Sequence, residues 1–359
     1  MKRLSFLVFF ICSFTIESLQ INIVNAADIL DVSINNSSKL IKKFALIDTV
    51  SSTPRVIEVD AGSGSIIWEW KIPSNFIRTH NKRRPICAGA GLTLNDDKSI
   101  NALIPHFGVV NIQRNGDYKI LITDEHIDHT AETLSDGKIL FTRGFVDKAV
   151  ASFIIKNESN EIVWEWKPEN YFRSKKDFSI PGQTCRGALR NASEREKDWA
   201  HANDVVVLEN GNFVLSMRNL SLFVEVDSDG RILKQFNTIQ GVHQPTPYLG
   251  GYLAADRNCG EESLILLAAD GTQKKLFTGE FLLIRSIEPL GGDHFLITSA
   301  TTISEISLDG KIHYKAHVKG ISSTAEIGMT SVRKIPSVGY CGPKTLYQSI
   351  PTLFGEINK

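Results

Sequence analysis

The chain has 359 residues, and its 40 basic side chains balance 40 acidic ones, so the formal net charge is zero. It contains no basic block and no stripe of interleaved basic and aromatic residues, which argues against a nucleic-acid partner. Four of the five cysteines follow Cys12, and they are spaced too widely for a CxxC metal or redox motif.

The first 26 residues have the pattern of a secretory signal peptide. Lys2 and Arg3 precede an apolar run from Leu4 to Ile16, and small residues occupy the usual cleavage positions before Ala27. The run is shorter than the ~20 residues that cross a bilayer, and no later segment is long and apolar enough to do so. We therefore expect an exported protein, periplasmic or secreted, with no membrane span after cleavage. Disulfides are permitted there, but the sequence does not fix their pairing.

The remaining sequence is typical of an all-β protein. Short β-branched and aromatic runs recur between Asp, Asn and Gly residues, and helical periodicity is almost absent. Six segments have the composition of tight hairpin turns, in which Gly or Asn supplies a positive φ. These segments are 60–62, 115–116, 157–160, 229–230, 270–271 and 309–310. Six turns of one kind predict six repeated units.

Each unit is predicted to contain four antiparallel strands. The pattern is clearest in residues 204–236, and similar units follow or precede it at 92–122, 129–166, 243–277 and 285–317. The first segment, 44–70, offers only three strands, so we expect the C-terminal stretch 330–335 to supply the fourth. The sequence thus predicts a six-bladed β-propeller over residues 27–359, closed by pairing of the C-terminal strand with the first blade.

Two outer strands end in matching tryptophan pairs, Trp68-Glu-Trp70 and Trp164-Glu-Trp166. Strand alternation puts both indoles of a pair on one face, with the glutamate opposite. Aromatics at matching places in two blades favour filling of the space between sheets over a platform for an aromatic ligand.

The longest departure from the repeat is the polar segment 168–198, which mixes basic and acidic residues and has no strand pattern. A loop of this length is either a surface excursion or a lid over the pocket.

Three units carry a histidine and an arginine at matching places. The histidine precedes the turn glycine by 8, 10 and 8 residues, and the arginine follows it by 6, 7 and 6. The pairs are His129 with Arg143, His201 with Arg218, and His243 with Arg257, and Arg285 takes the histidine position in the next unit. Repeats put equivalent residues in equivalent places, and the loop into the innermost strand lies at the channel mouth. We therefore expect these side chains to converge on one polar pocket.

Such a pocket suits a tetrahedral anion. Arginine presents a rigid fork of donors that matches sulfate, phosphate or carboxylate oxygens, and a neutral imidazole is a nucleophile or a proton carrier. We expect no metal and no organic cofactor. The alternative is that the repeats merely copied a structural residue.

The segments around these histidines resemble a known family. Asp198-Trp199-Ala-His201-Ala-Asn203-Asp204, continuing to Ser216-Met-Arg218-Asn219, is similar to a blade signature of the arylsulfotransferase (aryl-sulfate sulfotransferase) family of exported six-bladed propellers. Asp128-His129 through Gly137, and His243-Gln-Pro245, resemble two further signatures. The resemblance covers residues 44–335. The best-known members carry an additional N-terminal β domain, for which this chain has no room, so the expected form is a short, single-domain propeller.

The resemblance implies an activity and roles. Family members move a sulfuryl group from an aryl sulfate to a phenol without a nucleotide donor, through a sulfated histidine that matches His243. By the same comparison His129, His201, Asn203 and Arg218 bind the sulfuryl oxygens and assist proton transfer. The repeat positions, and not the resemblance, predict that Arg143, Arg257 and Arg285 bind the substrate. The expected partners are small molecules, and the sequence indicates no oligomeric state.

Two other functions are compatible with the same pattern. A non-catalytic propeller would bind an anionic ligand or a protein partner with these residues. A quinone-dependent dehydrogenase of propeller type shares the tryptophan repeats, but the sequence has no adjacent cysteine pair and no acidic calcium cluster to support it.

Overall fold

The computed structural model describes residues 30–35, 41–48, 53–77, 79–80, 84–85, 90–144, 151–172, 200–236, 241–258, 261–278, 284, 286–299, 302–318, 326–329 and 335–337. The expected signal peptide, most of the 168–198 segment, and Cys87, Cys185, Cys259 and Cys341 lie outside this part of the chain. Within it, no helix is long and apolar enough to cross a membrane.

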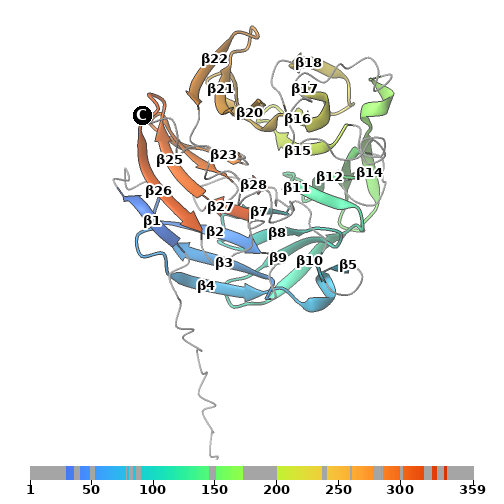
Figure 1. The fold of residues 1–359 in the computed structure, drawn as a ribbon. Coiled ribbons are helices and arrows are strands. Elements are labelled where there is room, and N and C mark those ends of the chain that lie inside the picture. Colours follow the sequence, from blue (N-terminus) through green and yellow to red (C-terminus); the bar gives the residue numbers. More distant parts are fainter. Residues whose placement is uncertain are drawn as a thin grey trace, which may run out of the picture.

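Six antiparallel sheets are arranged as the blades of a propeller, which confirms the predicted fold (Figure 1). From the innermost strand outward, blade 1 contains β27 (Glu326–Met329), β2 (Lys43–Asp48), β3 (Arg55–Asp60) and β4 (Ile66–Lys71). Blade 2 contains β7 (Ala90–Leu94), β8 (Ile100–Ile104), β9 (Gly108–Ile112) and β10 (Tyr118–Thr123). Blade 3 contains β11 (Ile127–Thr133), β12 (Ile139–Arg143), β13 (Ser152–Lys156) and β14 (Ile162–Trp166).

The second half repeats this order. Blade 4 contains β15 (Ala202–Val207), β16 (Phe213–Met217), β17 (Leu222–Val226) and β18 (Ile232–Phe236). Blade 5 contains β19 (His243–Tyr248), β20 (Gly251–Asn258), β21 (Glu261–Leu267) and β22 (Gln273–Thr278). Blade 6 contains β23 (Ser286–Gly291), β24 (His294–Thr298), β25 (Thr302–Ser307) and β26 (Ile312–Val318). Outside the blades lie β5 (Thr79–His80), β6 (Arg84–Pro85) and the 3₁₀ turns η1 (Ser74–Phe76), η2 (Pro168–Asn170) and η4 (Arg218–Leu220).

Every predicted turn joins the third and fourth strands of a blade. Four of them have their glycine at positive φ, as expected, and Asn160 takes the same conformation at 64° in blade 3. In blade 1 the positive φ of 73° belongs to Gly64 rather than Gly62, because the turn there is closed by a hydrogen bond from the Gly64 N–H to the Asp60 carbonyl at 2.8 Å. The recurring turn therefore sets the register of the repeat.

Both ends of the chain close the ring. The innermost strand of blade 1 is β27, which pairs Phe44 with Met329 and Ile47 with Glu326. The predicted closure is thus confirmed, but it lies just before the predicted stretch 330–335. Two further strands were not predicted: β28 (Ile335–Ser337) pairs with β7 of blade 2, and β1 (Leu30–Asn35) pairs with β26 on the outer edge of blade 6. These strands cover edges that would otherwise be open.

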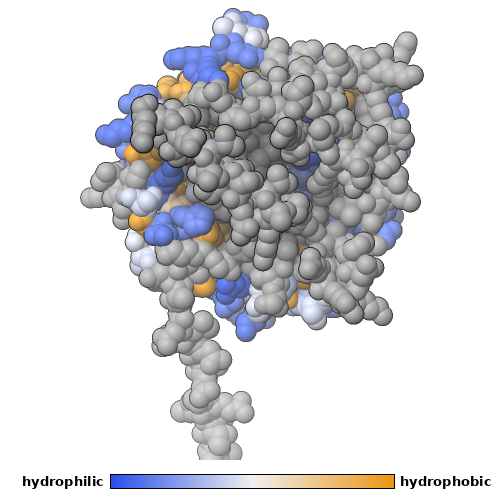
Figure 2. Space-filling model, in the orientation of Figure 1, coloured by the Kyte–Doolittle hydropathy of each residue, from blue (hydrophilic) through white to orange (hydrophobic). Residues whose placement is uncertain are grey.

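The hydrophobic core lies between neighbouring blades, and the tryptophan pairs belong to it. Trp68 and Trp70 pack against blade 2, and Trp164 and Trp166 pack against blade 4. Two indole N–H groups donate across the same junctions, from Trp68 to the Arg114 carbonyl at 3.1 Å and from Trp166 to the Gly230 carbonyl at 3.0 Å. Their predicted role as filling between sheets is confirmed. Outside the core, Figure 2 shows hydrophilic side chains around the rim of one face, with small apolar areas between them.

Replacing Trp166 with alanine is expected to lower the free energy of unfolding by roughly 3–5 kcal/mol, because a buried indole and its hydrogen bond are lost together. Trp166 is 2% exposed and stacks on Tyr171 with ring centroids 4.6 Å apart. The control is Ile162→Ala on the same strand, where 47% exposure predicts a change within about 0.5 kcal/mol. Urea unfolding of both variants measures the difference, and equal losses would contradict this account.

Candidate active site

The three predicted histidines lie at the innermost strands of blades 3, 4 and 5, and each strand is irregular there. The register shifts between Asp128 and Ala131 in β11, between Ala202 and Asp204 in β15, and between His243 and Thr246 in β19. A bulge leaves residues unpaired and re-aims their side chains, and bulges concentrate next to functional sites.

The backbone at these bulges is strained. His129 has a φ of 59°, His201 of 53° and Gln244, the residue after His243, of 36°. Residues with a side chain rarely occupy this left-handed region, and such conformations cluster at active sites and ligand clamps. The equivalent strain in three neighbouring blades marks these bulges as the candidate site.

His129 and His201 form a buried pair across the junction of blades 3 and 4. Their Nε2 atoms are 3.2 Å apart, the ring planes are nearly perpendicular at 88°, and each residue is 1% exposed. Arg218, in η4 directly after β16, places Nη2 3.3 Å from Nδ1 of His201. The structure therefore brings together three of the predicted site residues.

The hydrogen bonds fix the tautomers of the two imidazoles. A guanidinium can only donate, so Nδ1 of His201 accepts and its proton sits on Nε2. That Nε2–H donates to Nε2 of His129, which leaves the His129 proton on Nδ1. Nδ1 in turn lies 2.8 Å from Oδ1 of Asp128, in a bent contact with a carboxylate that is 1% exposed. Every hydrogen bond in this chain is therefore donated in the direction from Arg218 to Asp128.

His243 is anchored separately. Its Nδ1 lies 2.7 Å from the carbonyl oxygen of Gly241, and because a carbonyl can only accept, the proton sits on Nδ1 and the lone pair on Nε2. The residue is fully buried. A neutral imidazole with a fixed Nε2 lone pair is the form that acts as a nucleophile.

Hydrogen bonds between blades hold these strands in register. Thr130 donates its hydroxyl to the Asn203 carbonyl at 3.0 Å, and Oδ2 of Asp204 accepts the Gln244 backbone N–H at 2.7 Å. The side-chain oxygen of Gln244 accepts the backbone N–H of Ile287 in blade 6 at 3.1 Å. Blades 3 to 6 are thereby linked through the residues that flank the histidines.

The Asn203 side chain has one satisfied end and one unsatisfied end. Its Nδ2 donates to Oδ2 of Asp204 at 2.6 Å. Asn203 is 0% exposed, so water does not reach its Oδ1. No residue that the structure describes donates a hydrogen bond to this oxygen. Buried acceptors are nearly always satisfied, so this oxygen requires an explanation.

Arg143 does not join the histidines. Its guanidinium binds the carboxylate of Asp124 through Nη2 and, at 3.2 Å, through Nε. The register explains the difference: Arg143 pairs with Ile127, two residues before His129, whereas the Arg218 N–H donates directly to the His201 carbonyl at 3.1 Å. Arg257 lies in β20, two residues beyond the partner of His243, and Arg285 is outside the described residues.

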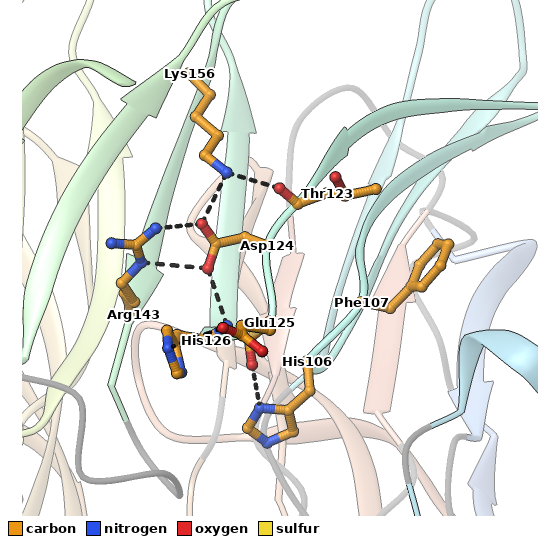
Figure 3. Close-up of a pocket in the computed structure, with 8 residues that line it drawn as sticks. All are labelled: His106, Phe107, Thr123, Asp124, Glu125, His126, Arg143 and Lys156. Atoms are coloured by element: carbon orange, nitrogen blue, oxygen red, sulfur yellow. Dashed lines mark hydrogen bonds and ion pairs between the residues drawn. The ribbon is translucent and has the colours of Figure 1, made fainter. Parts of the chain in front are cut away.

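Arg143 instead lines a pocket of about 470 Å³ between blades 2 and 3, together with His106, Phe107, Thr123, Asp124, Glu125, His126 and Lys156. Asp124 lies between the Arg143 guanidinium and the Lys156 ammonium (Figure 3). Burial alone would raise the pKa of Asp124, but the hydrogen bonds from Arg143 and Lys156 outweigh it, so the pKa lies below its usual value.

A lowered pKa makes the contribution of Asp124 to stability pH-dependent. The contribution is complete above the unfolded-state pKa of about 3.9 and is lost as the pH falls through the folded-state value. Asp124→Asn is expected to cost about 3 kcal/mol at pH 7, and the gap to the unmodified protein should narrow below about pH 4. Urea unfolding across this range tests it, with Asp229→Asn, in an exposed pair with Arg231, as a near-neutral control. A gap independent of pH would contradict the prediction.

Sequence reasoning missed Asp128, Asp204 and Gln244. An acidic residue stands directly before His129 and directly after Asn203, so a charged neighbour at the repeat position was the available signal.

In the described part of the chain, no three histidine, cysteine, aspartate or glutamate side chains are grouped closely enough to hold a metal ion.

A sequence model of the Arylsulfotransferase (ASST) family matches residues 33–236. The chain belongs to this family. The match includes His129, His201, Asn203 and Arg218, and it ends before His243. Membership supports a sulfotransferase-like function and small-molecule substrates. No curated protein sequence is detectably similar to it.

Two solved structures are similar to this chain, and the first of them has the same fold. A protein of unknown function from Bacteroides caccae is 14% identical, with a TM-score of 0.51, over 79% of this chain and 98% of its own. An inactivated virginiamycin B lyase from Staphylococcus aureus, solved with quinupristin, is 12% identical, with a TM-score of 0.49, over 87% of this chain and 100% of its own. Identities this low concern the fold alone.

Proposed function

We propose that the protein is an exported sulfotransferase that moves a sulfuryl group from an aryl sulfate to a phenol through a sulfated His243. The observation that carries the proposal is the anchoring of His243 Nδ1 on the Gly241 carbonyl, which keeps the lone pair on Nε2. Family membership supports the reaction class. The proposed mature chain is residues 27–359, after a signal peptide at 1–26, with an insertion at 168–198.

The transfer takes two steps. Nε2 of His243 attacks sulfur, the ester S–O bond breaks, and its electron pair leaves on the aryl oxygen. The acceptor oxygen then attacks sulfur, the S–N bond breaks, and its electron pair returns to Nε2. Two steps through a covalent imidazole adduct allow both substrates to use one pocket in turn.

The neighbouring side chains stabilise charge and move the proton. Arg218 supplies positioned donors for the sulfuryl oxygens, on which negative charge spreads in the transition state. The His129–His201 pair receives the proton of the acceptor at Nε2 of His129, after the Nε2–Nε2 hydrogen bond between the two rings has opened. Arg257 and Arg285 remain proposed donors to the anionic group, whereas Arg143 is left out because Asp124 engages it.

Steady-state kinetics with a chromogenic aryl sulfate and a phenolic acceptor test the proposal. A ping-pong pattern, with phenol release that depends on the acceptor, is expected. Saturable binding of sulfate esters without phenol release would instead support a non-catalytic propeller that binds an anionic ligand or a protein partner.

A further inference from the structure

The orientation of the Asn203 amide follows from chemistry. A carboxylate can only accept, so the atom that faces Asp204 at 2.6 Å must be the amide nitrogen. Oδ1 therefore points the other way, as a hydrogen-bond acceptor. It is buried, and no described residue donates to it. An acceptor kept dry and unsatisfied is costly, which points to a ligand that carries a donor.

Asn203 is connected to both His201 and the backbone beside His243. It is the extra residue of the bulge in β15, two residues after His201. Its partner Asp204 also binds the backbone N–H of Gln244, the residue that follows His243. One carboxylate oxygen thus fixes both the Asn203 amide and the backbone beside the proposed nucleophile.

The substrates of the proposed reaction differ in what they offer to Oδ1. The oxygens of an aryl sulfate, including the ester oxygen, only accept hydrogen bonds. A phenolic acceptor carries an O–H that donates. A carbonyl oxygen at this position can therefore form a hydrogen bond with the phenol that accepts the sulfuryl group, but not with the aryl sulfate that donates it.

We propose that Asn203 recognises the sulfuryl acceptor: Oδ1 accepts the hydrogen bond of the phenol hydroxyl, and Asp204 is a positioning residue that fixes the amide. The inference rests on the proposed function and refines the role implied by the family resemblance, which directs Asn203 to the sulfuryl oxygens. The bonded hydroxyl orients its oxygen lone pair toward sulfur. As the S–O bond forms and the S–N bond breaks, the hydroxyl proton leaves Oδ1, which is not a base. It passes to Nε2 of His129, whose lone pair becomes free when the contact with Nε2 of His201 opens.

The two half-reactions separate this role from sulfuryl binding. Release of 4-nitrophenolate from 4-nitrophenyl sulfate without acceptor reports sulfation of the enzyme, since this leaving group departs without needing a proton. Loss of the adduct mass after addition of phenol reports the second half-reaction. In Asn203→Ala the first rate should stay within about threefold, and the second should fall roughly 10- to 100-fold.

A second variant and a control complete the experiment. Asp204→Asn removes the charge that fixes the Asn203 amide, while its remaining oxygen can still accept the Gln244 N–H. It should therefore slow the second half-reaction more than the first even if Asn203→Ala fails to fold. The control is Asn101→Ala, another buried amide in a cross-blade network, which should slow neither half-reaction selectively. Equal losses in both half-reactions, or no loss in either, would overturn the acceptor role. Absence of any adduct in the unmodified protein would instead reject the proposed function itself.

Discussion

Replacing His243 with glutamine is expected to abolish sulfuryl transfer, with a loss of roughly 10⁴-fold or more in kcat. Glutamine is close to histidine in size and polarity, so it should fit the buried site. Its amide stands nearer the place of Nε2 than of Nδ1, so the contact of Nδ1 with the Gly241 carbonyl at 2.7 Å is lost. The amide has no nucleophilic nitrogen, because its lone pair is delocalised into the carbonyl. The variant therefore removes the covalent step and the contact with the Gly241 carbonyl. Phenol release in the presence of acceptor measures the loss.

The matched control for this substitution is His106→Gln. His106 is also buried, at 7% exposure, and its Nδ1 lies 3.0 Å from the Glu125 carbonyl, so it makes the same kind of anchoring contact. It lines the pocket between blades 2 and 3, away from the contacts of His129, His201 and His243 (Figure 3). Turnover in this control should remain within about threefold of the unmodified protein. A His243→Gln protein that kept a tenth of its turnover would contradict the covalent account.

Replacing Arg218 with methionine is expected to lower kcat by roughly 10²- to 10³-fold, the usual effect of removing one positioned donor to a developing anion. Two causes act together. The variant loses the charge and planar fork that we propose for binding the sulfuryl oxygens. It also loses the donor that lies 3.3 Å from Nδ1 of His201 and fixes the tautomer of that ring. Arg218→Lys should recover only part of the loss, because a point charge does not reproduce the planar fork.

Arg143→Met tests whether the register argument is correct. Because Asp124 binds the Arg143 guanidinium, this variant should lose stability while its kcat changes less than about threefold. Similar losses of kcat in the Arg143 and Arg218 variants would show that both arginines face the substrate, which the contact of Arg143 with Asp124 does not allow. The comparison needs only steady-state rates and urea unfolding of the two proteins.

The fold could be predicted because its signals are local. Each hairpin turn depends on one Gly or Asn at positive φ, and strand alternation supplies the rest of a blade. The strands that were missed depend on distant partners. Leu30–Asn35 becomes a strand only because β26 offers an open edge, and Glu326–Met329 is a short segment selected by its pairing with β2.

The site could be predicted only as far as the repeat is regular. The matching positions of the histidines predicted that His129 and His201 lie together, and the matching position of the arginine predicted that Arg218 joins them. The structure shows both contacts. Spacing failed at Arg143, because a small shift of register along a strand carries a side chain away from its expected neighbours. The bond from Asp204 to Gln244 joins residues of two blades across a bulge, and no periodicity encodes such a contact.

The most direct test of the central claim is the intact mass of the purified mature protein after brief exposure to an aryl sulfate, measured beside the His243→Gln variant. The account predicts a gain equal to one sulfuryl group in the unmodified protein, its disappearance on addition of a phenol, and no gain in the variant. A gain of the same size in both proteins, or none in the unmodified protein while phenol is released, would contradict transfer through His243.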